Sequence, residues 1–69
     1  MKKFAICIVK GNEQKIVSTH DIKDEAIKNG DKVNNQLSKD EGVVSCIFGE
    51  FDKNNNLISK NSVIHKVWL

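Results

Sequence analysis

The stretch DIKDEAIKNGDKVNNQL, residues 21–37, separates two strand-like halves of the 69-residue chain and decides its fold. Apolar side chains recur in it at intervals of four, seven and four residues, at Ile22, Ala26, Val33 and Leu37. Gly30 falls on the same stripe, Ile27 lies beside it, and lysines and acids fill the other side. This spacing predicts a helix with one buried face.

The residues that flank this stretch predict where the helix ends. Asp21 can accept hydrogen bonds from the free amides of a first turn, so we expect the helix to begin there. We expect one continuous helix that reaches to near Asp40, with Gly42 as the terminating residue. Gly30, next to Asn29, either lets the helix lie close to a sheet or breaks the segment in two.

Strand-like runs lie on both sides of the helix. Before it, Lys3–Val9 and Gln14–Thr19 are joined by a turn that contains Gly11, which predicts a β-hairpin. After it, Val43–Phe51 and Leu57–Leu69 form a second hairpin across an asparagine-rich turn. The order ββαββ predicts an α+β fold, a four-stranded, mainly antiparallel sheet with one helix packed across one face.

Size and composition restrict the class of protein. The chain is short and contains no proline, so we expect a single domain over residues 1–69. The longest apolar run, Phe4–Val9, is too short to span a bilayer, and no membrane partner is expected. Cys7 and Cys46 each lie in an apolar stretch, which is typical of buried thiols in a reducing compartment and predicts a cytoplasmic location. The polar residues 56–61 are expected to project from the second hairpin as a mobile arm.

The strands carry apolar residues on both of their faces. In the first strand, alternation assigns Phe4, Ile6 and Ile8 to one face and Ala5, Cys7 and Val9 to the other. One helix covers a single face, so the second face needs another cover, either a second copy in a homodimer or a different macromolecule. The predicted interface on this second face consists of Cys7, Ile64, Lys66 and Trp68, with Trp68 as the strongest candidate for a hot spot.

The distribution of charge allows a second hypothesis. The chain has a net charge of +2, and its basic strands flank an acidic helical segment. All eleven basic residues are lysines, so no guanidinium can clamp a phosphate or read a guanine edge. Sheet-mediated binding of RNA or single-stranded DNA would use Lys3, Lys10, Lys15 and Lys66, together with the aromatic residues Phe48, Phe51 and Trp68 as stacking platforms.

Metal and cofactor sites receive little support. Asp52 begins the first half of a calcium loop, but Leu57 replaces its glycine and Val63 its bidentate glutamate, so a hairpin turn is the preferred interpretation. The two cysteines and two histidines lack the close spacing of structural zinc ligands, and a zinc site would require neighbouring strands to bring Cys7 and Cys46 together. We therefore predict no cofactor and no metal.

No catalytic motif supports an enzyme. The attractive nucleophiles are the two buried-looking cysteines, and no base stands near either of them in the sequence. His20 is expected at the surface or beside the helix start, and His65 on a mainly apolar strand face. The sequence predicts a small non-enzymatic interaction or regulatory module with no evident small-molecule substrate, which forms a homodimer or docks a protein partner through the helix-free face of its sheet. The alternative is the nucleic-acid binding described above.

Overall fold

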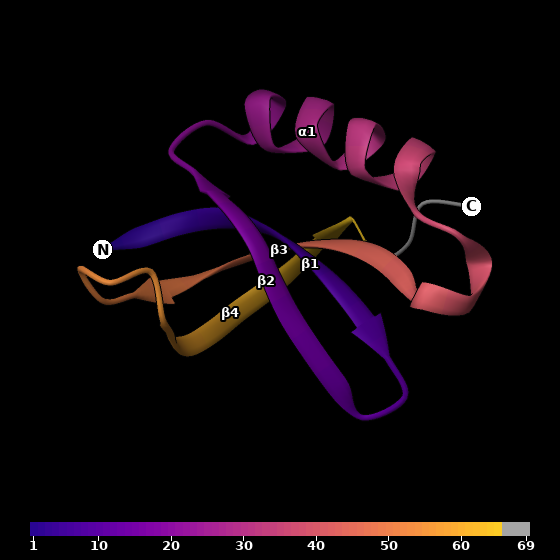
Figure 1. The fold of residues 1–69 in the computed structure, drawn as a ribbon. Helices are drawn as coiled ribbons and strands as arrows, with labels where there is room; N and C mark the ends of the chain where they lie inside the picture. The colour runs from indigo at the N-terminus through magenta and orange to yellow at the C-terminus, as the bar shows by residue number, and fades with distance from the viewer. Residues whose placement is uncertain (66–69) are drawn as a thin grey trace.

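The computed structural model describes the backbone of residues 1–65 and the side chains of residues 1–38 and 40–60. Its elements are β1 (Lys2–Lys10), β2 (Glu13–His20), α1 (Lys23–Gln36), the short 3₁₀ helix η1 (Lys39–Glu41), β3 (Val43–Phe51) and β4 (Leu57–His65). The four strands form one antiparallel sheet and α1 lies across one face of it (Figure 1). The predicted α+β fold with the order ββαββ is confirmed.

The two most apolar strands pair in the centre of the sheet. The strand order is β2-β1-β3-β4, so each hairpin contributes one central strand and one edge strand. Met1 continues the central pair, because its amine donates to the carbonyl oxygen of Phe51 at 2.9 Å and its own carbonyl accepts from the Phe51 amide at 2.8 Å. A central strand is covered on both sides, which is why β1 and β3 are apolar on both faces.

The helix is shorter than the sequence predicted. It begins after Ile22, which occupies the N-cap position and makes no side-chain capping hydrogen bond, so the prediction that Asp21 caps the helix is wrong. Ile22 is 55% exposed and lies outside the core. The helix ends at Gln36, because Leu37 takes an extended conformation, and it does not reach Asp40. Gly30 lies buried within the continuous helix and does not break it.

A capping box explains why the chain does not continue as one helix to Asp40. The Glu41 carboxylate accepts hydrogen bonds from the Ser38 hydroxyl at 2.8 Å and from the Ser38 amide at 3.2 Å, and this starts η1 as a separate turn. Gly42 then follows with a φ of +122°, and a Cβ there would stand 2.6 Å from the carbonyl oxygen of Val9. Gly42, which the sequence predicted as the helix terminator, must therefore be a glycine because the chain passes close to β1 at this point.

The face under α1, called here the helix-covered face, contains the first of two apolar clusters. Its fully buried members are Ile6, Ala26, Val44 and Cys46, and Phe4, Ile27, Val33 and Leu37 pack against them. The rings of Phe4 and Phe48, directly opposite each other in the β1–β3 pair, have centroids 4.7 Å apart. The predicted apolar stripe of the helix packs here, apart from Ile22.

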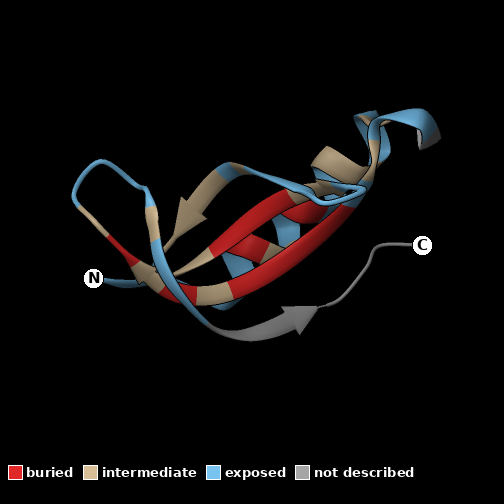
Figure 2. Cartoon of the chain, turned by 90° about the horizontal axis from the view of Figure 1, so that it is seen from below, coloured by how far each residue is buried: buried red, intermediate tan, exposed pale blue. Residues whose placement is uncertain are grey.

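The opposite, helix-free face contains the second cluster. Its buried members are Ala5, Cys7, Ile47 and Phe51, and Val9, Ile16 and Leu57 pack against them. All four buried residues are at most 1% exposed in the single chain. These four residues are buried within the single chain, so the expectation that another molecule must cover this face is wrong for them; Ile16 of β2 and Leu57 of β4 are among the side chains that pack against them. Figure 2 shows the buried stretches of β1 and β3 side by side in the middle of the sheet.

Irregular pairing lets the edge strands bend around the helix-free face. Val17 is an extra residue of β2 with no partner in β1. β4 has three such positions relative to β3, at Ile58, Asn61 and Ile64. A bulge bends its strand and increases the local twist. Bent edge strands can bring their side chains over the helix-free face, so that apolar residues are buried on both faces of one sheet.

Gly49 brings β4 close to β3. A Cβ at this position would stand 2.6 Å from the carbonyl oxygen of Ser59 and 2.9 Å from a methyl carbon of Leu57, so the close approach requires a glycine. Leu57, Ser59 and Lys60 all pair with β3. The prediction that residues 56–61 form a projecting arm is therefore wrong for the start of β4, which belongs to the ladder.

Candidate interaction surface

A groove opens between β2 and the turn that leads into β4. It has a volume of about 520 Å³ and is lined by Gln14, Lys15, Ile16, Val17, Ser18, Thr19, Asn54, Asn55, Asn56 and Leu57. The two sides come from different hairpins. In Figure 1 β2 crosses in front of the other strands, and this turn lies at the left end of the sheet. Amide and hydroxyl side chains dominate the lining, whereas the apolar cluster of the helix-free face lies below them.

The turn side of the groove is held by Asp52. Its Oδ1 atom accepts hydrogen bonds from the amides of Asn54 at 2.8 Å and Asn56 at 2.9 Å, and Oδ2 accepts from the Asn56 side chain at 3.3 Å. These hydrogen bonds lower the pKa of the Asp52 carboxyl, with the Asn56 amide as the largest cause. Asn55 adopts a φ of +64°, which asparagine tolerates well. The interpretation of residues 52–56 as a hairpin turn is confirmed, because the Asp52 carboxylate stabilises the turn through these hydrogen bonds.

The two thiols lie on opposite faces of the sheet. Cys7 belongs to the helix-free cluster and Cys46 to the helix-covered one, although their strands are neighbours. Burial raises the pKa of both thiols; a nearby Lys60 ammonium partly opposes this for Cys7, whose Sγ donates to the Ser45 carbonyl oxygen at 3.5 Å. Neither thiol forms a disulfide, and the described residues contain no group of three or more potential metal ligands.

The predicted interface residues are only partly placed by the structure. Cys7 is fully buried, so it lies beneath the helix-free surface and does not form part of it. Ile64 falls at a register shift in β4, with no partner in β3. Lys66 and Trp68 lie outside the described residues. An interface made by Ile64, Lys66 and Trp68 stays a prediction, with Cys7 buried beneath the surface.

The predicted nucleic-acid contacts are divided between the two faces. Lys10 and Lys15 belong to the helix-covered face, since they share it with Ile8 through strand alternation and pairing. Lys3 alternates with Ala5 and belongs to the helix-free face, opposite Gly49, while Lys66 lies outside the described residues. Sequence reasoning omitted Lys60, which pairs with the other side of Gly49. Lys3 and Lys60 therefore flank a glycine that carries no side chain.

The aromatic residues proposed as stacking platforms are not displayed together. Phe48 lies on the helix-covered face against Phe4, and Phe51 is fully buried in the helix-free cluster. Trp68 lies outside the described residues. Among the described side chains, Phe48 and Phe51 thus face opposite sides of the sheet and pack within the protein.

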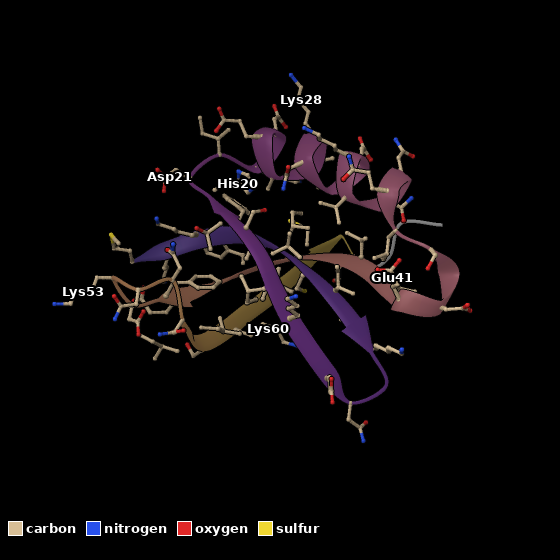
Figure 3. All side chains as sticks on the ribbon, in the orientation of Figure 1. His20, Asp21, Lys28, Glu41, Lys53 and Lys60 are labelled. Atoms are coloured by element: carbon tan, nitrogen blue, oxygen red, sulfur yellow. The ribbon has the colours of Figure 1, made fainter. Side chains whose placement is uncertain are left out.

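A polar cluster that the sequence analysis missed joins the helix to β2. The Ser18 hydroxyl lies 2.8 Å from Nε2 of His20, and the Asn29 side-chain amide donates to the same hydroxyl at 2.7 Å. All three side chains are half-buried, and His20 lies beside the start of the helix, one of the two places predicted for it. The two-residue spacing of Ser18 and His20 could have suggested a shared face, but the contribution of Asn29 depends on how the helix lies. Figure 3 shows His20 beneath the first turns of α1.

Charge differs between the helix and the strands. Residues 21–42 contain six acids and four lysines, whereas the remaining sequence contains seven lysines and three acids. Of the strand acids, Glu50 is paired with the Met1 amine at 2.5 Å, which lowers the pKa of its carboxyl. Lys28 points away from the sheet, on the outer side of α1 (Figure 3). Among the side chains that the structure describes, no acidic one lines the groove.

The comparisons with known proteins do not assign a family: no protein-family model, no curated protein and no solved structure matches the chain. None of the helices in the described part of the chain is long and apolar enough to cross a membrane.

Proposed function

We propose that this chain is a small, non-enzymatic protein-interaction module that binds a polypeptide partner on the helix-free side, at the groove between β2 and Asn54–Leu57. The observation that supports it most is the position of the groove beside an edge strand. An edge strand presents unpaired backbone amides and carbonyls, and an extended polypeptide satisfies them by strand addition. The side chains of Gln14 and Asn54–Asn56 add donors and acceptors suited to peptide groups.

The lining also favours a polypeptide over a small metabolite. Small-molecule sites are mainly apolar cavities with a few convergent polar groups. Here the apolar side chains Ala5, Cys7, Ile47 and Phe51 are sealed within the protein, and the open surface above them is polar. A non-enzymatic role fits the chemistry of the thiols, since burial favours their neutral form and a thiol nucleophile requires the thiolate.

The test is affinity capture with a groove variant and a matched control. The groove variant carries Gln14→Arg and Asn54→Arg, one exposed position on each side of the groove. The control carries Asn35→Arg and Gln36→Arg, two exposed amide residues near the end of α1. Both variants gain the same charge, so a partner bound in the groove is lost with the first and kept with the second. Equal capture by both variants, or no protein captured by the wild type, contradicts the proposal.

The predicted interface around Trp68 needs its own variant. Trp68→Ala is expected to weaken partner binding or self-association without unfolding the chain, because tryptophan commonly anchors protein interfaces. Light scattering across a concentration series, with reductant present, measures self-association, and circular dichroism verifies the fold. Unchanged fold together with unchanged capture and association would remove Trp68 from the interface.

A second candidate function, binding of RNA or single-stranded DNA, is favoured by one observation. Lys3 and Lys60 face each other across Gly49 on the helix-free side. Fluorescence anisotropy with mixed-sequence single-stranded oligonucleotides at low salt tests it, with Lys3→Gln/Lys60→Gln compared with Lys28→Gln/Lys32→Gln on the helix. If these lysines contact phosphates, the first pair reduces the salt dependence by a slope of about 1.4, since each contact contributes about 0.7 for a single strand. Absence of salt-sensitive binding by the wild type excludes it.

A further inference from the structure

The two edges of the sheet differ in how regular they are. β2 has eight residues and one bulge, at Val17, whereas β4 has nine residues and three register shifts. Bulges disrupt the row of backbone groups that a new strand would pair with, and natural edges use them to prevent pairing. β2 is therefore the better of the two edges for strand addition.

The bulge divides the side chains of β2 between the faces in a symmetric way. Pairing with β1 assigns Glu13, Lys15, Ser18 and His20 to the helix-covered face and Gln14, Ile16 and Thr19 to the helix-free face. When a second β2 runs antiparallel beside the first, with Ile16 opposite Val17, each remaining residue meets one from its own face. Without the extra residue Val17, the same pairs would lie on opposite faces, because strand side chains alternate.

The chemistry of these pairs is also complementary. The antiparallel arrangement places Glu13 opposite His20, Gln14 opposite Thr19 and Lys15 opposite Ser18. No pair places two like charges opposite each other, an arrangement that would destabilise a cross-strand pair. At the centre, Ile16 meets Val17, which is apolar and 42% exposed in the single chain.

We propose that the partner at β2 is a second copy of this chain, which pairs antiparallel through β2 to form a continuous eight-stranded sheet with both helices on the same face. This inference rests on the proposed function and specifies the polypeptide partner as a second copy of the same chain. A two-fold axis perpendicular to the sheet relates the two copies, so each residue pair occurs twice. The contact is limited to one strand from each copy, and such small interfaces are weak, so the dimer forms at high protein concentration.

The experiment is light scattering on a size-exclusion column across a concentration series up to about the millimolar range, with reductant present. It compares Val17→Lys with the matched control Ile58→Lys. Both positions are exposed apolar bulge residues on edge strands, 42% and 64% exposed, but only the first lies on β2. We expect the wild type and Ile58→Lys to move from 7.8 kDa towards twice that mass and Val17→Lys to remain monomeric. Circular dichroism confirms that each variant is folded.

A second measurement keeps the proposal testable if Val17→Lys fails to fold. Amide hydrogen exchange of the wild type should slow with concentration in residues 13–20 and stay constant in residues 57–60. A monomer at every concentration overturns strand pairing between copies, as does a dimer that survives Val17→Lys or is lost with Ile58→Lys. The groove variant then separates the two proposals, because loss of a captured partner through Gln14→Arg/Asn54→Arg supports the interaction module even where self-pairing fails.

Discussion

The two faces of the sheet are both buried, but by different means. α1 covers one face with the apolar stripe that includes Ala26, Val33 and Leu37. No helix of the described residues covers the other face, where Ile16 of β2 and Leu57 of β4 pack against the buried cluster. Each cluster contains four fully buried residues. A small chain can therefore build a second core without a second helix when bulges let its edge strands bend.

The most severe test of this comparison removes one large side chain from each face. Phe51→Ala should cost about 3–5 kcal/mol and Ile6→Ala about 2–5 kcal/mol of unfolding free energy, because both side chains are fully buried. A domain of this size has an unfolding free energy of roughly 3–10 kcal/mol in total, so Phe51→Leu serves as the milder variant at the same position. Urea denaturation measures all three. A loss below about 1 kcal/mol for Phe51→Ala would mean that the helix-free cluster is not a core.

The next test concerns how β4 comes close enough to cover its face. Gly49→Ala should destabilise by about 1–3 kcal/mol, because the new Cβ meets the Ser59 carbonyl oxygen at 2.6 Å. Hydrogen exchange should show faster opening of residues 57–60. Gly11→Asn is the control, since no atom lies within 4 Å of a Cβ there and asparagine tolerates the φ of +61°. Equal stability of Gly49→Ala and the wild type would contradict the close approach.

A smaller effect should appear on the helix-covered face alone. Ser18→Ala removes the hydroxyl shared by His20 and Asn29, so α1 loses a hydrogen bond to β2. We expect a loss of about 0.5–1.5 kcal/mol, measured by thermal or urea unfolding. Ser59→Ala, at an exposed serine of β4, should stay within about 0.5 kcal/mol of the wild type. Similar losses for the two variants would show that the cluster does not hold the helix.

The smallest expected effect is a dependence of stability on acid pH. The Met1 amine is the main cause that lowers the pKa of the Glu50 carboxyl. Hydrogen bonds from the Ser38 hydroxyl and amide lower the pKa of the Glu41 carboxyl. A carboxyl whose pKa is lower in the folded state stabilises it above the unfolded pKa, and this stabilisation is lost as the pH falls through the folded pKa.

The melting temperature should therefore fall as the pH drops below about 4.5, the ordinary glutamate value. Glu50→Gln should flatten this decline by removing the contribution near the end of β3, and Glu41→Gln by removing the one at η1. Thermal melts between pH 7 and pH 2.5 compare them. A pH profile identical to that of the wild type in both variants would show that neither pair contributes.

The sequence by itself determined the number and order of the strands and the place of the helix α1 between them, but not the short helix η1. Apolar alternation located the strands, the spacing from Ala26 to Leu37 located the helix, and Asp52 with its asparagines marked the second turn. These signals are local, because strand alternation, helical periodicity and turn residues act over a few neighbouring positions. Alternation also assigned Cys7 and Ile6 to opposite faces correctly.

Only the tertiary structure decided how the second face is covered and what lies at the candidate surface. The bulges at Val17 and Ile58, the close approach at Gly49 and the groove between β2 and Asn54–Leu57 depend on where distant strands meet. The same holds for the hydrogen bond from Asn29 to Ser18. The end of the helix at Gln36 was missed because the Ser38–Glu41 capping box competes with helical continuation. Contacts between residues far apart in the chain are set by packing, and local patterns carry no record of them.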